Sequence, residues 1–179
     1  GAHHSQSLEA WFAHVPGLTV VAPSDPADAR GLLASAIRAD DPVIFLEHRG
    51  LYWTKGPVPD GDHRTPIGEA IVRRPGRDVT VVAWSRMVGT ALAAADVLTA
   101  EGIEVEVIDA RTLLPLDIAT MVASVERTGR LVVASEAVVT GGVGAEIAAS
   151  VASRAATGAL KAPVERVGAP FVPPPAGPD

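Results

Sequence analysis

Residues 79–108, VTVVAWSRMVGTALAAADVLTAEGIEVEVI, contain a strand, a helix and a second strand in direct succession. Val79–Trp84 is a short apolar run rich in β-branched residues, which is typical of a buried strand. Ser85 is a suitable cap for the helix that follows, and Glu104–Ile108 is the next strand. The segment therefore predicts one strand–helix–strand unit of a parallel sheet.

The same alternation continues toward the C-terminus with short connections. The pattern predicts helices over 117–127 and 143–156 and strands over 131–135 and 164–167. Such a chain winds a parallel sheet through right-handed crossovers, so the predicted fold class is α/β. The composition fits this class, because only 4% of the residues are aromatic and the core must be built from Val, Ala, Leu and Ile.

The first 47 residues alternate in the same way but offer only two strands. The pattern predicts two helices and two strands, over residues 8–14, 26–38, 18–22 and 43–47. Ser7 is the expected N-cap of the first helix and Asp25 that of the second. Because two strands do not form an independently stable sheet, we expect this segment to be the end of a larger domain whose beginning is missing.

A proline- and glycine-rich stretch, residues 48–77, separates the two regular segments. It holds few apolar residues, and a structureless loop of this length is unusual inside one domain. We therefore predict a domain over residues 1–58, a linker over 59–77 and a second domain over 78–179.

The composition excludes several classes of protein. The net charge of −6 argues against a nucleic-acid partner, because phosphate binding needs clustered Lys and Arg. The absence of cysteine excludes disulfides, thiolate metal sites and a Cys nucleophile, and it suits a cytoplasmic protein. The longest apolar runs are far too short to cross a membrane, so we expect no membrane partner.

Two features near helix starts are ambiguous. Gly141-Gly142 could cradle a phosphate, but we favour a tight turn between strand and helix, because Ile147 interrupts the glycine pattern. The pair His3-His4 is either the remnant of a purification tag or part of the fold. The capped helix that follows directly favours the second interpretation.

Charged residues at strand ends are the remaining candidates. Asp109, Arg111 and Glu136 stand where parallel sheets bind ligands, although such residues more commonly pair with other side chains. No Ser-His-Asp set, pair of catalytic carboxylates or metal-spaced cluster is present in the sequence. Two function classes therefore stay open: an enzyme subunit whose active site is shared with other segments, and a docking module of a larger assembly.

Six stretches resemble the β subunits of pyruvate, branched-chain 2-oxoacid and acetoin dehydrogenase complexes, in the order that this family has them. These stretches are His4–Phe12, Pro16–Pro23, Asp28–Leu33, Asp41–Glu47, Val107–Asp117 and Glu136–Gly142. The resemblance implies the C-terminal half of a thiamine-diphosphate pyrimidine-binding domain, followed by a transketolase C-terminal-like domain with a mostly parallel sheet.

The same resemblance implies cofactors and partners. Family members are α2β2 tetramers in which the α subunit holds the diphosphate and Mg²⁺, and they pass an acyl group to a lipoyl acyltransferase core. The resemblance implies that the β-subunit glutamate that activates thiamine lies upstream of Gly1, because Glu47 and Glu136 fall in other motifs of the family. We therefore expect a chain that is truncated at both ends and is inactive by itself.

Two sets of site residues follow from the resemblance. His4 is the expected catalytic residue, because the family's His-Ser-Gln histidine stands at the mouth of the thiamine site. Family members of the pyruvate type also bind K⁺ through backbone carbonyls at a helix end, which here would belong to Ala36, Ile37, Ala39 and Asp41. An ordinary hydrated helix end is the alternative for these four residues.

The resemblance leaves alternatives open. Transketolase and deoxyxylulose-phosphate synthase share the C-terminal domain but lack the His-Ser-Gln-Ser run, and an assembly or docking module needs no catalysis. The oxoacid is not identified by the sequence, although His48–Tyr52 and Lys55–Pro59 are closer to pyruvate or acetoin enzymes.

Overall fold

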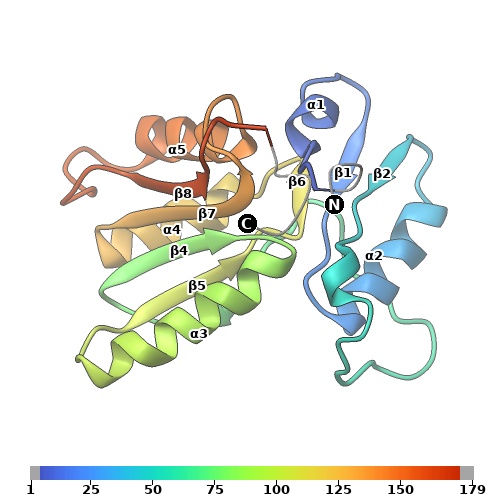
Figure 1. Cartoon of the computed structure of the whole chain (residues 1–179), viewed down its shortest axis with the longest axis horizontal. Coiled ribbons are helices and arrows are strands. Elements are labelled where there is room, and N and C mark those ends of the chain that lie inside the picture. Colours follow the sequence, from blue (N-terminus) through green and yellow to red (C-terminus); the bar gives the residue numbers. More distant parts are fainter. Residues whose placement is uncertain (1–4, 174–179) are drawn as a thin grey trace.

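The computed structural model describes residues 5–173, which form two sheets with their helices (Figure 1). The larger sheet has five strands in the order β3-β5-β4-β7-β8, and the smaller has three in the order β2-β1-β6. His4 and the proline-rich residues 174–179 lie outside the described residues.

The five-stranded sheet is mostly parallel, as the sequence predicted. Its parallel strands are β4 (Val79–Ala83), β5 (Val105–Asp109), β7 (Leu131–Val138) and β8 (Glu165–Ala169). The central strands are rich in Val because both faces of the sheet are covered by helices, so their side chains are buried on each side.

Helix α3 (Arg86–Ala100) covers one face of this sheet, while α4 (Ile118–Thr128) and α5 (Val143–Arg154) cover the other (Figure 1). On the α3 side the core consists mainly of Ala and Val, and the buried Ala91 and Ala95 allow the helix to approach the strands closely. The other face carries larger side chains, including the fully buried Met121 and Ile147. Small and large residues therefore divide between the two layers of the core.

The first part of the chain forms α1 (Glu9–Ala13), β1 (Thr19–Val21), α2 (Pro26–Ile37) and β2 (Val43–Phe45). Asp25 caps α2 as predicted, because its carboxylate accepts a hydrogen bond from the Asp28 backbone N–H at 2.7 Å. The prediction of Ser7 as a cap is wrong. Helix α1 has only five residues, and its N-cap is Leu8, which makes no side-chain capping bond.

The small sheet contains a third strand that the sequence did not predict. Strand β6 (Thr112–Leu114) belongs to the second part of the chain, yet it pairs antiparallel with β1, opposite the parallel partner β2. Val20 and Val21 of β1 are completely buried as a result. The two strands expected from residues 1–47 are thus completed by residues 112–114.

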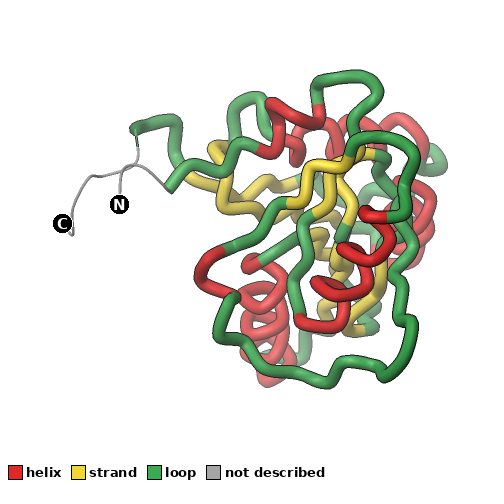
Figure 2. Tube along the Cα trace, turned by 90° about the vertical axis from the view of Figure 1, so that its right-hand side faces the viewer, coloured by secondary structure: helices red, strands yellow, loops and turns green. Residues whose placement is uncertain are grey.

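The predicted linker also differs from the structure at its end. Strand β3 (Ile71–Arg74) lies within the stretch 59–77 and pairs antiparallel with β5, so these four residues belong to the large sheet. Earlier in the connection, η1 (Arg49–Leu51) is a single 3₁₀ turn. Much of the remaining path between β2 and β3 is loop (Figure 2). Among residues 5–173, no helix is long and apolar enough to cross a membrane.

Candidate functional site

A groove with a volume of about 1000 Å³ lies where the two parts of the chain meet. It is bordered by residues that follow β2 and β4 and by the end of β7, which is where parallel sheets commonly bind ligands. The groove is lined by Ser5, Gln6, Ser7, Leu8, Glu9, Ala22, Leu46, Glu47, His48, Arg49, Tyr52, Trp53, Trp84, Ser85 and Glu136.

A buried hydrogen bond links the two parts of the chain in this groove. The indole N–H of Trp84, directly after β4, donates to Glu9 Oε1 at 3.1 Å. Both residues are almost fully buried, with 4% and 5% of their surfaces exposed. A buried carboxylate needs such a donor, so Trp84 accounts for a Glu at the start of α1.

A second contact across the groove is the pair His48–Glu136. The His48 Nε2 atom lies 2.9 Å from Glu136 Oε2, and the side chains are only 26% and 33% exposed. On the other side of the ring, Nδ1 accepts the Gly50 backbone N–H at 3.0 Å. Because Nδ1 is an acceptor, the hydrogen of the neutral ring stands on Nε2 and is donated to Glu136.

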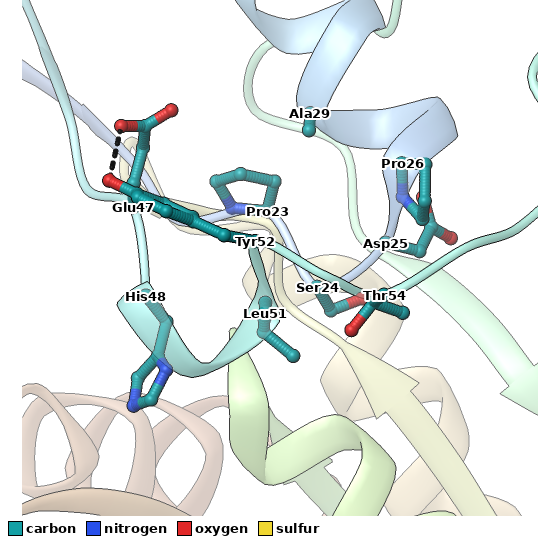
Figure 3. Close-up of a pocket in the computed structure, with 10 residues that line it drawn as sticks. All are labelled: Pro23, Ser24, Asp25, Pro26, Ala29, Glu47, His48, Leu51, Tyr52 and Thr54. Atoms are coloured by element: carbon teal, nitrogen blue, oxygen red, sulfur yellow. Dashed lines mark hydrogen bonds between the residues drawn. The ribbon is translucent and has the colours of Figure 1, made fainter.

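A smaller cavity of about 290 Å³ lies beside the groove and shares Glu47, His48 and Tyr52 with it (Figure 3). Its other walls come from Pro23–Pro26, Ala29 and the segment of η1. The Tyr52 hydroxyl donates to Glu47 Oε2 at 3.1 Å, and this hydrogen bond together with the carboxylate charge raises the pKa of Tyr52. Glu47 therefore holds the aromatic ring at the boundary of the two cavities.

Arg73 of β3 contacts three carboxylates, one of which, Asp25, lines the smaller cavity. Its Nη1 lies 2.8 Å from Asp25, its Nη2 lies 2.9 Å from Asp109, and it also contacts Asp28. Burial opposes the charge of Arg73, but the three carboxylates outweigh burial and raise its pKa above the ordinary value. Asp25 and Asp28 belong to the first part of the chain and Arg73 to the large sheet, so the cluster joins the two parts.

Asp109 and Arg111, predicted to stand at a strand end, both belong to this cluster. The Arg111 guanidinium pairs with Asp28 at 3.1 Å and not with Asp109. From Arg111, Asp109 accepts the backbone N–H, also at 3.1 Å. Asp109 is fully buried and accepts the Ser24 hydroxyl at 2.5 Å. Burial raises the pKa of Asp109, although Ser24 and Arg73 act in the opposite direction.

The other predicted positions lie in separate places. Gly142 begins α5 so close to the preceding strand that an added Cβ would lie 2.9 Å from the Val138 carbonyl oxygen, which is the geometry of a tight turn. Ala36 and Ile37 end α2, where the Ala36 carbonyl accepts the Ala39 N–H at 3.2 Å, and Asp41 follows on the exposed surface. These carbonyls lie outside the groove.

Sequence reasoning missed Asp28, Arg73 and the role of His48. Arg73 stood in the predicted linker, and Asp28 appeared only as part of a motif. A recognisable signal for Arg73 is its place between apolar Ile71-Val72 and a proline, which suits a short edge strand. Its carboxylate partners could not be identified, because they lie more than thirty positions away in the chain.

Comparison with known proteins gives the family. The family model of the transketolase C-terminal domain matches residues 68–179. This chain belongs to the transketolase C-terminal domain family. The model of the transketolase pyrimidine-binding domain also matches residues 1–54, so the transketolase-type architecture extends to the first part of the chain.

Curated relatives match this transketolase-type chain over nearly its whole length. The β subunit of acetoin:2,6-dichlorophenolindophenol oxidoreductase from Cupriavidus necator is 51% identical over 99% of the chain, which covers 52% of that protein. Pyruvate dehydrogenase E1 subunit β-2 of Oryza sativa is 50% identical over 98% of the chain and 47% of the relative. The chain thus spans about half the length of the curated relatives it matches.

A solved structure has the same fold. It is described as a split-gene transketolase in an inactive β4 tetramer and is 31% identical, with a TM-score of 0.79. The match covers 96% of this chain and 55% of that one. The arrangement of a pyrimidine-binding part and a transketolase C-terminal part is therefore shared with a transketolase.

Proposed function

We propose that this chain is part of the β subunit of a thiamine-diphosphate-dependent 2-oxoacid dehydrogenase. Its complete enzyme would decarboxylate a 2-oxoacid and transfer the acyl group to lipoyl. The observation that carries this proposal is the identity of about half over nearly the whole chain with β subunits named for pyruvate dehydrogenase and acetoin oxidoreductase. The partners would be an α subunit, in an α2β2 tetramer, and a lipoyl acyltransferase core.

The groove is where the residues of this chain would border thiamine diphosphate. Its lining includes Trp84, whose indole N–H is bound by Glu9, and Ser5–Ser7, which directly follow His4 in the sequence. These features fit an aromatic ring at a domain boundary. When bound, thiamine diphosphate supplies the carbon nucleophile and the electron sink of the reaction. Mg²⁺ would be held by the α subunit, as the resemblance to the dehydrogenase β subunits implies.

His4 is the proposed catalytic residue, although it lies outside the described residues. When the acyl group moves to the lipoyl disulfide, the departing sulfur must gain a proton. A histidine changes charge near the working pH, so it suits this transfer, whereas decarboxylation needs no such donor.

The test of the function is His4→Ala in the full-length β subunit assembled with its α subunit. We expect acyl transfer to a free lipoyl domain to fall by about 10²-fold or more. Decarboxylation coupled to an artificial electron acceptor should fall far less. Equal losses in the two assays, together with weaker thiamine binding, would show that His4 only shapes the entrance. No decarboxylation by the wild-type assembly with either pyruvate or a branched-chain 2-oxoacid would refute the proposed enzyme.

A K⁺ site at the end of α2 is a separate proposal. The carbonyls of Ala36, Ile37, Ala39 and Asp41 stand at or just after the negative end of a twelve-residue helix. If they bind K⁺, the melting temperature of the full-length assembly should rise with KCl but not with an equal concentration of tetramethylammonium chloride. Identical melting curves in the two salts would remove the site.

A further inference from the structure

The contact His48–Glu136 joins the two parts of the chain at the wall of the groove. His48 is carried by the loop after β2, and Glu136 by the end of β7, so the pair bridges segments that belong to different sheets. Both ring nitrogens of His48 are occupied, since Nε2 donates to Glu136 and Nδ1 accepts from Gly50. The ring is therefore fixed in one orientation and one tautomer.

His48 also determines the position of the turn that follows it. It is the N-cap residue of η1, and the bond from Gly50 to its ring closes that turn. An added Cβ at residue 50 would lie 2.9 Å from His48 Cε1, so the ring packs directly on the turn. Movement of His48 would consequently move Tyr52 and Trp53, the residues that come next.

Tyr52 and Trp53 form the exposed aromatic border of the groove. They are 60% and 90% exposed, respectively, which is unusual for such large side chains in a groove wall. Aromatic surfaces of this kind suit an extended apolar chain, and the groove volume of about 1000 Å³ has room for one. The lipoyl-lysine arm of an acyl acceptor has this chemistry, whereas a small oxoacid does not extend to the border.

We propose that His48 and Glu136 are a positioning pair that holds this aromatic border in place for the acyl acceptor, an inference that rests on the proposed function. Neither residue exchanges a proton with substrate. Glu136 acts through His48, and His48 acts through the turn Arg49–Leu51. The other charged residues of the groove lining are Glu47, which holds Tyr52, Glu9, which binds Trp84, and Arg49.

The experiment compares Glu136→Ala with Glu136→Gln in the full-length assembly. Two acceptors are used with each variant: a free lipoyl domain and the small dye 2,6-dichlorophenolindophenol. For Glu136→Ala the KM for the lipoyl domain should rise about two- to fivefold relative to the KM for the dye, which corresponds to the loss of one partly exposed contact. Glu136→Gln keeps an oxygen that accepts the His48 N–H, so it should restore most of the loss.

Two controls make the outcome decisive. Glu101→Ala removes an equal charge at the exposed end of α3, outside the groove, and should leave the ratio of the two KM values as in the wild type. The double variant His48→Ala/Glu136→Ala should be no worse than His48→Ala alone, because Glu136 acts only through His48. Equal changes of both KM values, or a loss in kcat alone, would overturn the positioning pair while the enzyme's activity still supports the proposed function. A wild-type assembly that decarboxylates no oxoacid would overturn both.

Discussion

Arg73 is the residue that holds the two parts of the chain together electrostatically. One guanidinium faces three carboxylates, and Arg111 supplies the second positive charge of the cluster through Asp28. The two arginines cannot balance all three aspartates if each is ionised, and burial raises the pKa of Asp109, which is fully buried. The three carboxylates should therefore contribute unequally to stability.

We predict that Asp28→Asn destabilises the chain much more than Asp109→Asn. Asp28 alone pairs with both arginines, so its loss leaves two buried cations short of a partner and should cost about 3 kcal/mol. Asn at position 109 removes a charge that burial disfavours and keeps an acceptor for Ser24, so about 1 kcal/mol is expected. The free energy of unfolding in urea measures both effects. Asp96→Asn is the control, because the Asp96 side chain is 74% exposed and its pair with Arg74 should contribute almost nothing to stability. Equal effects at 28 and 109 would refute this ranking.

Asp117 gives a prediction about acid stability. Burial alone would raise its pKa, but hydrogen bonds from the Thr120 hydroxyl and N–H and from the Ala70 N–H lower it. Its carboxylate form is therefore preferred in the folded state. This contribution is fully present above the unfolded pKa and is lost as pH falls through the lower folded value.

We accordingly expect Asp117→Asn to unfold at lower urea concentration than the wild type near pH 6, with the difference shrinking toward about pH 3. Urea midpoints across this range provide the measurement. A difference between the two proteins that stays constant with pH would show that the titration of Asp117 does not contribute.

The turn between β3 and β4 depends on one glycine. An added Cβ at Gly76 would lie 2.2 Å from the backbone N of Glu106, and backbone atoms of β5 cannot yield as a side chain can. We predict that Gly76→Ala lowers the free energy of unfolding by about 3 kcal/mol. Gly89→Ala is the matched control in the exposed face of α3, where the added methyl has open space and should stabilise the helix by about 0.5–1 kcal/mol. In thermal unfolding, the melting temperature should fall for Gly76→Ala and rise for Gly89→Ala, relative to the wild type.

Elements with a strong local pattern could be predicted from the sequence, and those defined by distant partners could not. The strands β4, β5 and β7 can be recognised in the sequence because they are rich in Val and follow turn or helix-ending residues. Strand β6 has only three residues before a proline, and β3 has two apolar residues before Arg-Arg-Pro, so neither stands out. For the same reason His48 looked like a loop residue, because Glu136 makes it part of a groove only after folding.

At the scale of the whole molecule, the two parts form one cooperative unit, because β6 of the second part is a strand of the first part's sheet. Strand β1 is held on one side by β2 and on the other by β6, with Leu113 of β6 almost completely buried. The charge cluster around Arg73 also joins these two parts. Neither part should therefore open without affecting the other.

Hydrogen exchange tests this cooperation. In the wild type we expect the amides of β1 to be protected to the same free energy as those of β6, while the loop residues 53–62 exchange fast. Leu113→Ala should lower the protection of both strands together, by about 2–3 kcal/mol, because it removes a buried side chain from the shared core. Reduced protection of β6 alone, with β1 unaffected, would show that the first part of the chain is stable without its third strand.

Strand β6 also has a consequence for the order in which the protein can fold during synthesis. Val20 pairs with Leu114, so the small sheet cannot close until the ribosome has released nearly a hundred further residues. The nascent segment that carries β1 must remain without β6 for that interval, so the edge of β1 that β6 later covers stays open. It would be a natural client for a chaperone that shields unpaired strands, and a synonymous codon change that slows translation between residues 60 and 110 should increase aggregation without altering the mature protein.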